Sequence, residues 1–530
     1  QESAKTFAPH QQLLQASLKL LADNNSELRP QSPPASSWPA EFQIEVSDDR
    51  TLIAESAGQG SVPWQPIPLY SNEGLYRGWN LAWNSPGNRV AAYDPDGALQ
   101  WTWQPDWNIQ GGSGGYQLDS WGFVSGRILV LHLRGMVVAL DLTRTDLQSP
   151  PQPLWKVTPE RAASPNPQDD PREFVSPEER IEQYQLIPGG HFPVGPVSEF
   201  GVPLISGRSL RMLNLFTGHR LWELDVIPAD ARLLLDHDRL LILSDSARQT
   251  EVRSAIDGTL LATHHLPDWW GEAGSNQGLS VEEIDVEEGT DTLWRVLADA
   301  HRCVLFRLTA NEARLECRHL LTDTILWEHA FPQKTVVSNL ADGAIALLSD
   351  GRQLHIVDTA TGSIRINREL TPVVQPRKLY LRSVQGLFVL LPEALSEEDP
   401  SLDFFNPLID AAHVHGRIYG IRQTDGAVVW EHPVKHRQLR LEHSSQTRPL
   451  LPVLPLLVLL SRERDPASKG SAVVVGADVL DVRNGKLLYT DPNTGLTQNL
   501  LWMFPAKPGE LLLSFDRRFV RFTSIKKNTD

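Results

Sequence analysis

Apolar residues occur along this chain in short runs, and turn-forming residues separate one run from the next. Residues 240–243 read Leu-Leu-Ile-Leu and residues 344–348 read Ala-Ile-Ala-Leu-Leu. Runs of this length, bounded by turn residues, are typical of β-strands. The exception is residues 7–23, where leucines recur on one helical face and predict a short amphipathic helix. The pattern indicates an all-β chain with one N-terminal helix.

One arrangement of these runs repeats. Its clearest copy, residues 212–222, reads as a strand, a turn with Gly218, and a second strand that reaches Trp222. We call this arrangement the frame: Asp or Asn, three residues, Gly, three residues, Trp. It recurs, with departures, at residues 90–101, 138–155, 212–222, 252–262, 315–327, 354–366, 418–430 and 479–489. Recurrence of one strand–turn–strand unit indicates a repeat architecture.

Each position of the frame has a physical reason. Asp or Asn can accept hydrogen bonds from backbone N–H groups two or three residues later, and Gly supplies a positive φ. A Trp ring on the outgoing strand can cover the seam between neighbouring sheets and bury on the order of 200 Å². The residues expected to shape the repeat are Gly97, Trp101, Asp141, Trp155, Gly218, Trp222, Gly258, Trp327, Asp358, Gly362, Gly426, Trp430, Asp481 and Gly485.

The spacing of the frames suits blades of four strands. Consecutive frames lie roughly 40 to 65 residues apart, and a row of such sheets buries its faces by closing into a ring. We predict an eight-bladed β-propeller of four-stranded antiparallel blades over residues 41–530, preceded by the helix and a Pro/Ser-rich linker over residues 1–40. Strand-like residues 41–46 and 510–523 lack a frame, so we expect the first and last strands to share a blade. This closure leaves seven, eight or nine blades open.

Composition narrows the choice of partners. The chain of 530 residues carries a formal net charge of −16, and no cluster of Lys and Arg suits a nucleic acid or an anionic lipid surface. The longest apolar run, residues 450–460, is interrupted by Pro452 and Pro455 and is too short to span a bilayer, so we interpret it as a buried strand. The first residue is Gln, which indicates a processed chain or a part of a larger one.

Two loops carry candidate binding residues. Trp107 follows one outgoing strand, and Trp269 and Trp270 follow another. Exposed rings there would anchor a protein partner, and the alternative is that they pack under their own loops. Two further segments, residues 159–192 and 396–412, are inserts of the kind that lie on propeller faces.

Few residues suggest chemistry. A hairpin centred on Ala310 would place Cys303 and Cys317 opposite each other, at a distance suitable for a disulfide, and two buried thiols are the alternative. His413 and His415 alternate on one strand side without a third metal ligand. The acidic residues between 282 and 291 lack the order of a calcium loop. No nucleophile elbow, phosphate loop or zinc-protease motif occurs.

The frame resembles the repeat of pyrroloquinoline-quinone-type propellers, which include quinoprotein alcohol dehydrogenases and non-enzymatic outer-membrane assembly lipoproteins of bacteria. The resemblance covers residues 85–490. It departs at His319 and Arg422, which replace the Asp, and at Ala262 and Ile366, which replace the Trp. The family's dehydrogenases bind calcium and a quinone and hold adjacent cysteines, which this chain lacks, and no haem-attachment motif occurs.

These departures point to the non-enzymatic branch. We therefore expect no catalytic residue, no metal and no cofactor, and a scaffold that binds protein partners in a larger cell-envelope or extracytoplasmic assembly. The expected location is periplasmic or extracytoplasmic, without direct membrane insertion. The alternative is a divergent propeller enzyme, either a quinone-dependent dehydrogenase or a hydrolase acting on glycosides, because a carboxylate pair forms only in three dimensions.

Overall fold

A computed structural model of the chain describes residues 42–524 with gaps, of which the longest are 48–63, 72–78, 108–119, 158–196, 276–291, 395–410, 441–455 and 465–472. Several predictions fall outside the described residues. These are the helix at 7–23, the linker, Gly97, the insert at 159–192, nearly all of the insert at 396–412, and the acidic residues at 282–291. The domain boundary at residue 40 therefore stays a prediction.

The described chain is all-β apart from the short helix α4 (Asp268–Glu272). Its strands fall into consecutive antiparallel groups, and we number the eight groups that contain a frame as units 1 to 8. Unit 1 holds β2 (Trp64–Ile67), β4 (Asn80–Asn84), β5 (Arg89–Tyr93) and β6 (Leu99–Trp103). Unit 2 holds β7 (Ser120–Ser125), β8 (Ile128–Leu133), β9 (Met136–Asp141) and β10 (Gln152–Val157), with β3 (Leu69–Ser71) parallel to β7. Unit 3 holds β11 (Val202–Ser206), β12 (Ser209–Leu213) and β13 (Arg220–Leu224).

The middle of the chain continues in the same way. Unit 4 holds β14 (Arg232–Asp236), β15 (Arg239–Ser244), β16 (Gln249–Ser254) and β17 (Leu260–His265). Unit 5 holds β19 (Thr292–Ala298), β20 (Arg302–Leu308), β21 (Glu312–His319) and β22 (Ile325–Pro332), with β18 (Gly274–Ser275) parallel to β19. Unit 6 holds β23 (Thr335–Ala341), β24 (Ala344–Ser349), β25 (Gln353–Asp358) and β26 (Ile364–Glu369).

The last units lead into the closing sheet. Unit 7 holds β27 (Pro376–Val384), β28 (Leu387–Ala394), β29 (Ala411–Arg422) and β30 (Val428–Arg440), and unit 8 holds β31 (Leu456–Arg464), β32 (Val473–Asp481) and β33 (Leu487–Asp491). Units 6, 7 and 8 belong to one eleven-stranded sheet in which single residue pairs join the units, Ser338 with Leu379 and Gln438 with Leu460. The closing sheet holds β34 (Leu501–Phe504), β35 (Glu510–Phe515), β36 (Arg518–Ser524) and β1 (Phe42–Ser47).

The first and last strands pair as expected. All six residues of β1 lie antiparallel to β36, from Phe42 opposite Ser524 to Ser47 opposite Phe519. Because β1 precedes unit 1 in the chain and joins the sheet that follows unit 8, it ties the two ends of the array together. The described strands thus form eight frame units and a separate closing sheet, and the predicted count of eight blades is not confirmed.

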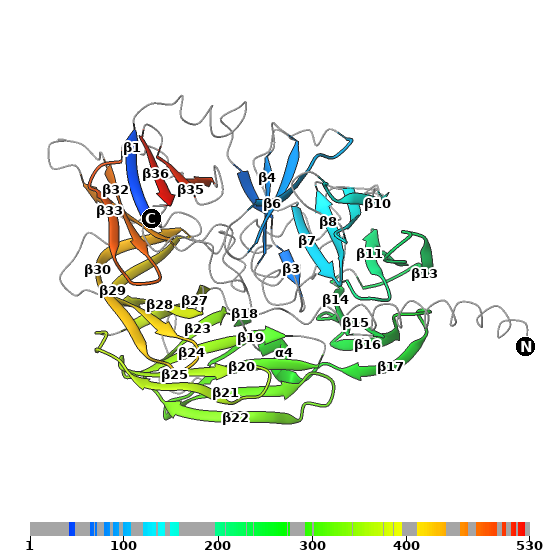
Figure 1. Cartoon of the computed structure of the whole chain (residues 1–530). Helices are drawn as coiled ribbons and strands as arrows, with labels where there is room; N and C mark the ends of the chain where they lie inside the picture. Colours follow the sequence, from blue (N-terminus) through cyan, green and yellow to red (C-terminus); the bar gives the residue numbers. More distant parts are fainter. Residues whose placement is uncertain are drawn as a thin grey trace, which may run out of the picture.

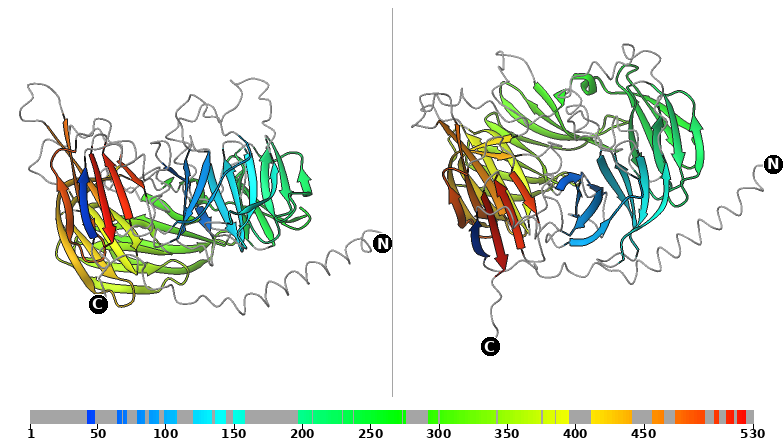
Figure 2. Two further views of the ribbon diagram at one scale, coloured as in Figure 1. Left: turned by 45° about the horizontal axis from the view of Figure 1, so that its top comes forward. Right: turned by 90° about the horizontal axis from the view of Figure 1, so that it is seen from above.

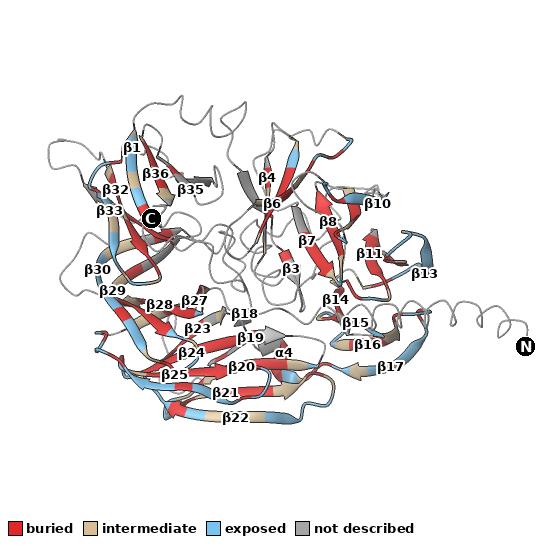
Figure 3. Ribbon diagram, in the orientation of Figure 1, coloured by how far each residue is buried: buried red, intermediate tan, exposed pale blue. Residues whose placement is uncertain are grey.

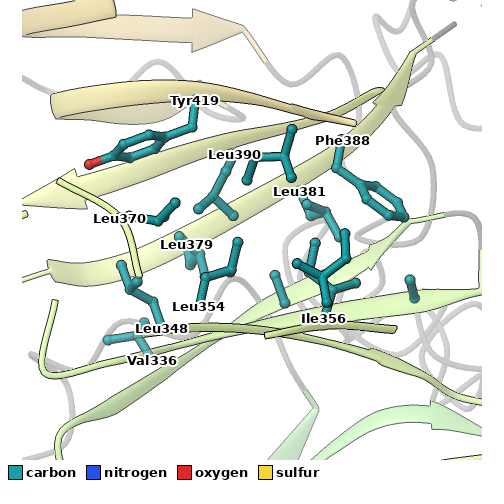
Figure 4. Close-up of a cluster of buried hydrophobic side chains, with 14 of the residues drawn as sticks. Val336, Leu348, Leu354, Ile356, Leu370, Leu379, Leu381, Phe388, Leu390 and Tyr419 are labelled. Carbon is teal, nitrogen blue, oxygen red and sulfur yellow. The ribbon is translucent and has the colours of Figure 1, made fainter. Parts of the chain in front are cut away.

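The units stand side by side, and their cores lie in the seams between them (Figures 1 and 2). Each of the eight hydrophobic clusters of the described residues joins two consecutive groups, from units 1 and 2 through to unit 8 and the closing sheet. Figure 4 shows the seam between units 6 and 7, where Leu354 and Ile356 face Leu379 and Leu381. Each such side chain contributes about 1.5–3 kcal/mol on burial, so the seams hold the array together.

The hairpin of β20 and β21 contains the two cysteines but does not bring them together. Val304, not Cys303, lies opposite Cys317, because the register is displaced by one residue from the predicted one. A displacement of one residue turns two side chains to opposite faces of a sheet. Cys303 accordingly lies in the seam between units 4 and 5, and Cys317 lies in the seam between units 5 and 6. Both are buried and unbridged, so the disulfide alternative is wrong.

The apolar run at 450–460 is a strand where the structure describes it. Residues 456–460 lie in β31 and are all buried. The two prolines precede the strand and lie outside the described residues.

Candidate protein-binding surface

The turn of the frame has the predicted chemistry. The Asp358 carboxylate accepts hydrogen bonds from the backbone N–H groups of Ala360 and Thr361 at 2.9 and 2.8 Å, and the Asn214 side-chain oxygen accepts the equivalent pair at 3.0 Å each. The described turn glycines have φ between 67° and 75°, where a Cβ is disfavoured. The turn is therefore fixed locally, by side-chain acceptors and glycine.

The frame Trp of one unit packs on the turn glycine of the next. A Cβ added to Gly218 would lie 2.7 Å from the Trp155 ring, and one added to Gly485 would lie 2.6 Å from the Trp430 ring. Trp222 contacts Gly258 in the same way. The indole N–H also donates across the seam, from Trp155 to the Leu215 carbonyl, from Trp222 to that of Ala255, and from Trp430 to that of Val482, at 2.7 to 2.8 Å. Trp and Gly of the frame are thus two halves of one contact between units.

The seams without a complete frame are filled in other ways. Ile366 takes the place of Trp against Gly426, and Trp327 covers Gly362 although its indole N–H has no hydrogen-bond partner. His329 Nε2 instead makes a hydrogen bond with the Gly362 carbonyl at 2.6 Å. At the start of the array, Trp101 is buried in the seam between units 1 and 2, and the Asp141 carboxylate accepts a hydrogen bond from the Thr143 N–H in the longer turn.

Trp269 and Trp270 are structural in this fold. Their side chains in α4 are only 7% and 2% exposed, so they lack the exposure that partner binding requires. The Trp269 N–H donates to the Asp323 carboxylate at 2.6 Å, and the Trp270 N–H donates to that of Asp245 at 2.7 Å. Unit 4 has Ala262 where the frame expects Trp, and α4 supplies the missing ring. Both rings are buried, but they fill the seam between units 4 and 5 and do not pack under their own loop alone.

Trp107 is placed differently. Its side chain is half-buried beside the core of units 1 and 2, and its ring lies edge-on to Trp103 with centroids 5.6 Å apart. Lys156 lies over the Trp107 ring at 5.5 Å and pairs with Asp106. The hydrogen bond from Lys156 holds the pKa of the Asp106 carboxyl below its ordinary value. Binding of a partner by Trp107 stays a prediction.

A β-bulge precedes the Trp position in every unit. In unit 3, Trp222 lies opposite Met212 while Arg220 lies opposite Leu213, which leaves Leu221 as the extra residue. The equivalent extra residues are Gln100, Leu154, Leu221, Leu261, Leu326, Arg365, Val429 and Leu488. A bulge re-aims the side chain that it contains. The extra residue is exposed in units 2 to 7, whereas Gln100 and Leu488 are partly buried. In most units it is aliphatic.

Exposed apolar side chains lie on the outer strands of three consecutive units and in the turns that precede two of these strands. We call them the belt patch, whose residues are Phe216, Leu221, Ile256, Leu260, Leu261, Ile325 and Leu326, each 43% to 55% exposed. Figure 3 shows the exposed outer strands β13, β17 and β22 beside their buried inner neighbours. The Trp222–Ala255 hydrogen bond joins units 3 and 4, and the Trp269–Asp323 hydrogen bond joins units 4 and 5. These contacts join the three units that carry the patch.

Ion pairs lie beside the belt patch. Arg211 and Arg220 both bind Glu223, and the hydrogen bond from Arg211 is the main cause that lowers the pKa of this carboxyl. Arg318 pairs with Glu316 and Asp323 on unit 5. An apolar patch with charged side chains at its margin is typical of protein–protein interfaces. The sequence contains the aliphatic residues, at the two positions before each Trp position. It does not reveal the bulge that exposes them.

Other candidate sites do not assemble in the described residues. His415 stacks on His436 with ring centroids 4.2 Å apart, while the side chain of His413 lies outside the described part of the chain. Among the described residues, no three His, Cys, Asp or Glu side chains lie close enough to hold a metal ion. In the same part of the chain, no helix has the length and apolar character needed to cross a membrane.

Comparison with known proteins gives fold-level likeness alone. No protein-family model and no curated protein matches the chain. Among solved structures, it is similar to BamB from Moraxella catarrhalis, with 14% identity over 88% of this chain and 95% of that chain, at a TM-score of 0.26. It is also similar to a europium-containing methanol dehydrogenase, with 12% identity over 74% of this chain and 81% of that chain, at a TM-score of 0.30. A third similar structure is the WD40 domain of SCAP from fission yeast, with 9% identity over 91% of this chain and 98% of that chain, at a TM-score of 0.31. Because these scores are low, the propeller assignment rests on the strand pairing and the seams.

Proposed function

We propose that this protein is a non-catalytic scaffold of the quinoprotein-like propeller type, with eight frame blades, that binds a folded protein partner through the belt patch. The observation that carries the proposal is the exposure of aliphatic side chains at equivalent positions of three adjacent units. Leu261 and Phe216 are both more than half exposed, on units held by the Asn214 turn and by the hydrogen bond from Trp222 to Ala255. A rigid apolar surface of this kind loses little conformational entropy on binding.

The proposed setting is a larger extracytoplasmic assembly in the cell envelope. This part of the proposal rests on the resemblance of the frame to envelope propellers. Cell fractionation of the source organism, with an antibody against the chain, checks it. Recovery in the cytoplasmic fraction would contradict the location and leave the belt patch as a proposal.

Charge placed on the patch tests the binding site. Leu221→Glu combined with Leu261→Glu changes two exposed residues, which leaves stability within about 0.5–1 kcal/mol, and should abolish capture of the partner from an extract of the source organism. Val429→Glu is the matched control, because Val429 is the equivalent bulge residue of unit 7 and is 41% exposed. A photoreactive side chain at position 256 should cross-link to the same partner. Equal loss in the control and the double variant would contradict the patch.

An inventory of bound groups separates the scaffold from an enzyme. Metal analysis and an absorbance scan of the purified protein would detect calcium and a quinone. One equivalent of each would overturn the scaffold proposal and favour a divergent dehydrogenase.

A further inference from the structure

Two arginines of the described chain are deeply buried on innermost strands, and they differ in their partners. Arg232 begins β14 and is 8% exposed, and its guanidinium pairs with Asp245 at 2.7 Å. Arg382 lies near the end of β27 and is 7% exposed. The Nε of each arginine is enclosed without a hydrogen-bond partner, but no carboxylate of the described residues forms an ion pair with Arg382. A buried cation without an anion costs several kcal/mol, so this position requires an explanation.

Most described neighbours of Arg382 are apolar. Along β27, Leu379 and Leu381 belong to the seam between units 6 and 7, whereas Tyr380 and Val384 face the seam between units 7 and 8. Alternation along a strand places Arg382 with the second pair. Its cross-strand neighbour is Val389, which is fully buried in the same seam. Polar groups are present at this seam too, because Ser461 of β31 is buried there and the Glu393 carboxylate acts electrostatically on Tyr380.

Burial does not remove the charge. It lowers the pKa of Arg382 to about 10, so the group remains a cation at neutral pH. A guanidinium offers five N–H donors in a planar fork that matches the oxygens of phosphate, sulfate or carboxylate. Tyr380 is the preceding residue on the same side, about 7 Å along the strand, and burial raises the pKa of its hydroxyl. A neutral hydroxyl on the same side of the strand offers one more donor.

We propose that Arg382 and Tyr380 form an internal site for one small oxyanion of the phosphate, sulfate or carboxylate type, at the seam between units 7 and 8. The anion supplies the counter-charge that Asp245 supplies to Arg232. Bound there, it stabilises the contact between these two units. The site is separate from the belt patch, which lies on units 3 to 5, so the two proposals stand or fall independently.

Calorimetric titration of the purified full-length chain with inorganic phosphate tests the site. Chloride holds the ionic strength constant, and acetate in a parallel titration distinguishes a carboxylate from a phosphate. The wild type should bind one phosphate or one acetate per chain, with a saturable rise of about 2 °C or more in the unfolding midpoint. Arg382→Met, which keeps the apolar stem, should weaken binding by more than about tenfold because it removes the bidentate donor.

Two controls make the outcome decisive. Arg377→Met removes a half-buried cation about 17 Å along the same strand. It should change affinity by less than about threefold, because charges further apart than the Debye length are largely screened. Without phosphate, Arg382→Met should unfold at or above the wild-type midpoint, since an unpaired buried charge is gone. The proposal is overturned if the wild type shows no saturable binding of either anion. It is also overturned if Arg382→Met binds like the wild type, or if that variant is markedly less stable in anion-free buffer.

Discussion

The seam between units 7 and 8 and the seam between units 4 and 5 use the same frame in opposite ways. In the first, Trp430 lies on Gly485 and donates to the Val482 carbonyl. In the second, Ala262 replaces the Trp and Asp323 replaces the Gly, with φ of 55°. The contact is restored by Trp269 of α4, which donates to the Asp323 side chain. The contact between units is thus present even where the residues of the frame are replaced.

Removal of the Trp rings should have the largest effect on the stability of these two seams. Trp430→Ala and Trp269→Ala should each lower the free energy of unfolding by about 3–5 kcal/mol, because each leaves a large cavity in a seam. Chemical denaturation of both variants measures the loss. A cost below about 1 kcal/mol for Trp269→Ala would show that α4 does not replace the frame Trp.

Placing Trp at position 262 should destabilise the protein unless the Trp269 ring is removed at the same time. Ala262→Trp inserts a second ring into a filled seam, and such overpacking should cost about 1–3 kcal/mol. The double variant Ala262→Trp with Trp269→Ala should recover part of the stability lost by each single change. A double-mutant cycle from thermal unfolding gives the coupling, and simple additivity would mean that the two rings do not compete for one place.

Substitutions in the turns should have smaller effects on stability and should separate the two seams further. Gly485→Ala forces a Cβ at φ of 68° to within 2.6 Å of the Trp430 ring, which should cost about 1–2 kcal/mol from the backbone alone. Asp323→Gly relieves the backbone but removes the acceptor of Trp269, so its net effect should be smaller. The two variants are compared by urea denaturation. A larger loss of stability for Asp323→Gly would show that the hydrogen bond contributes more to that seam than the backbone strain costs.

The smallest effect is a pH dependence of single turns. Burial opposes ionisation of Asp358, but the hydrogen bonds from Thr361 and the Arg365 guanidinium hold its pKa below the ordinary value. The resulting stability is present above the unfolded carboxyl pKa of about 3.9 and is lost as the pH falls below it. Asp358→Asn, which imitates the neutral Asn214 of unit 3, should flatten this part of the acid unfolding curve. An unchanged curve between about pH 4 and pH 2 would exclude the linkage.

The repeat and its turns could be predicted from the sequence because their causes are local. An acceptor, a glycine and an aromatic ring at fixed spacing define a turn and an outgoing strand without reference to the rest of the chain. The pairing of the first and last strands was also accessible, since both lack a frame. The blade count was not, because it depends on whether the closing strands form a group of their own.

The candidate sites were harder to predict because they depend on register. One residue of register decides that Cys303 and Cys317 lie in different seams. Trp269 is buried in the seam where Ala262 stands at the Trp position, a relation that spacing alone does not reveal. From the sequence, the charged residue Arg382 would be expected at the surface. Only the structure shows that it is buried at a seam.

The bulge at the outer strand has a consequence for the protein in solution. In every unit except unit 7, the last strand is a sheet edge. An even, unbroken edge is a template on which another chain can add a strand and begin to aggregate. The extra residue interrupts the ladder of hydrogen bonds and increases the local twist, at Leu221 as at its counterparts. The same distortion that turns an aliphatic side chain outward for a partner's surface thus protects the molecule's perimeter from growing into a fibre.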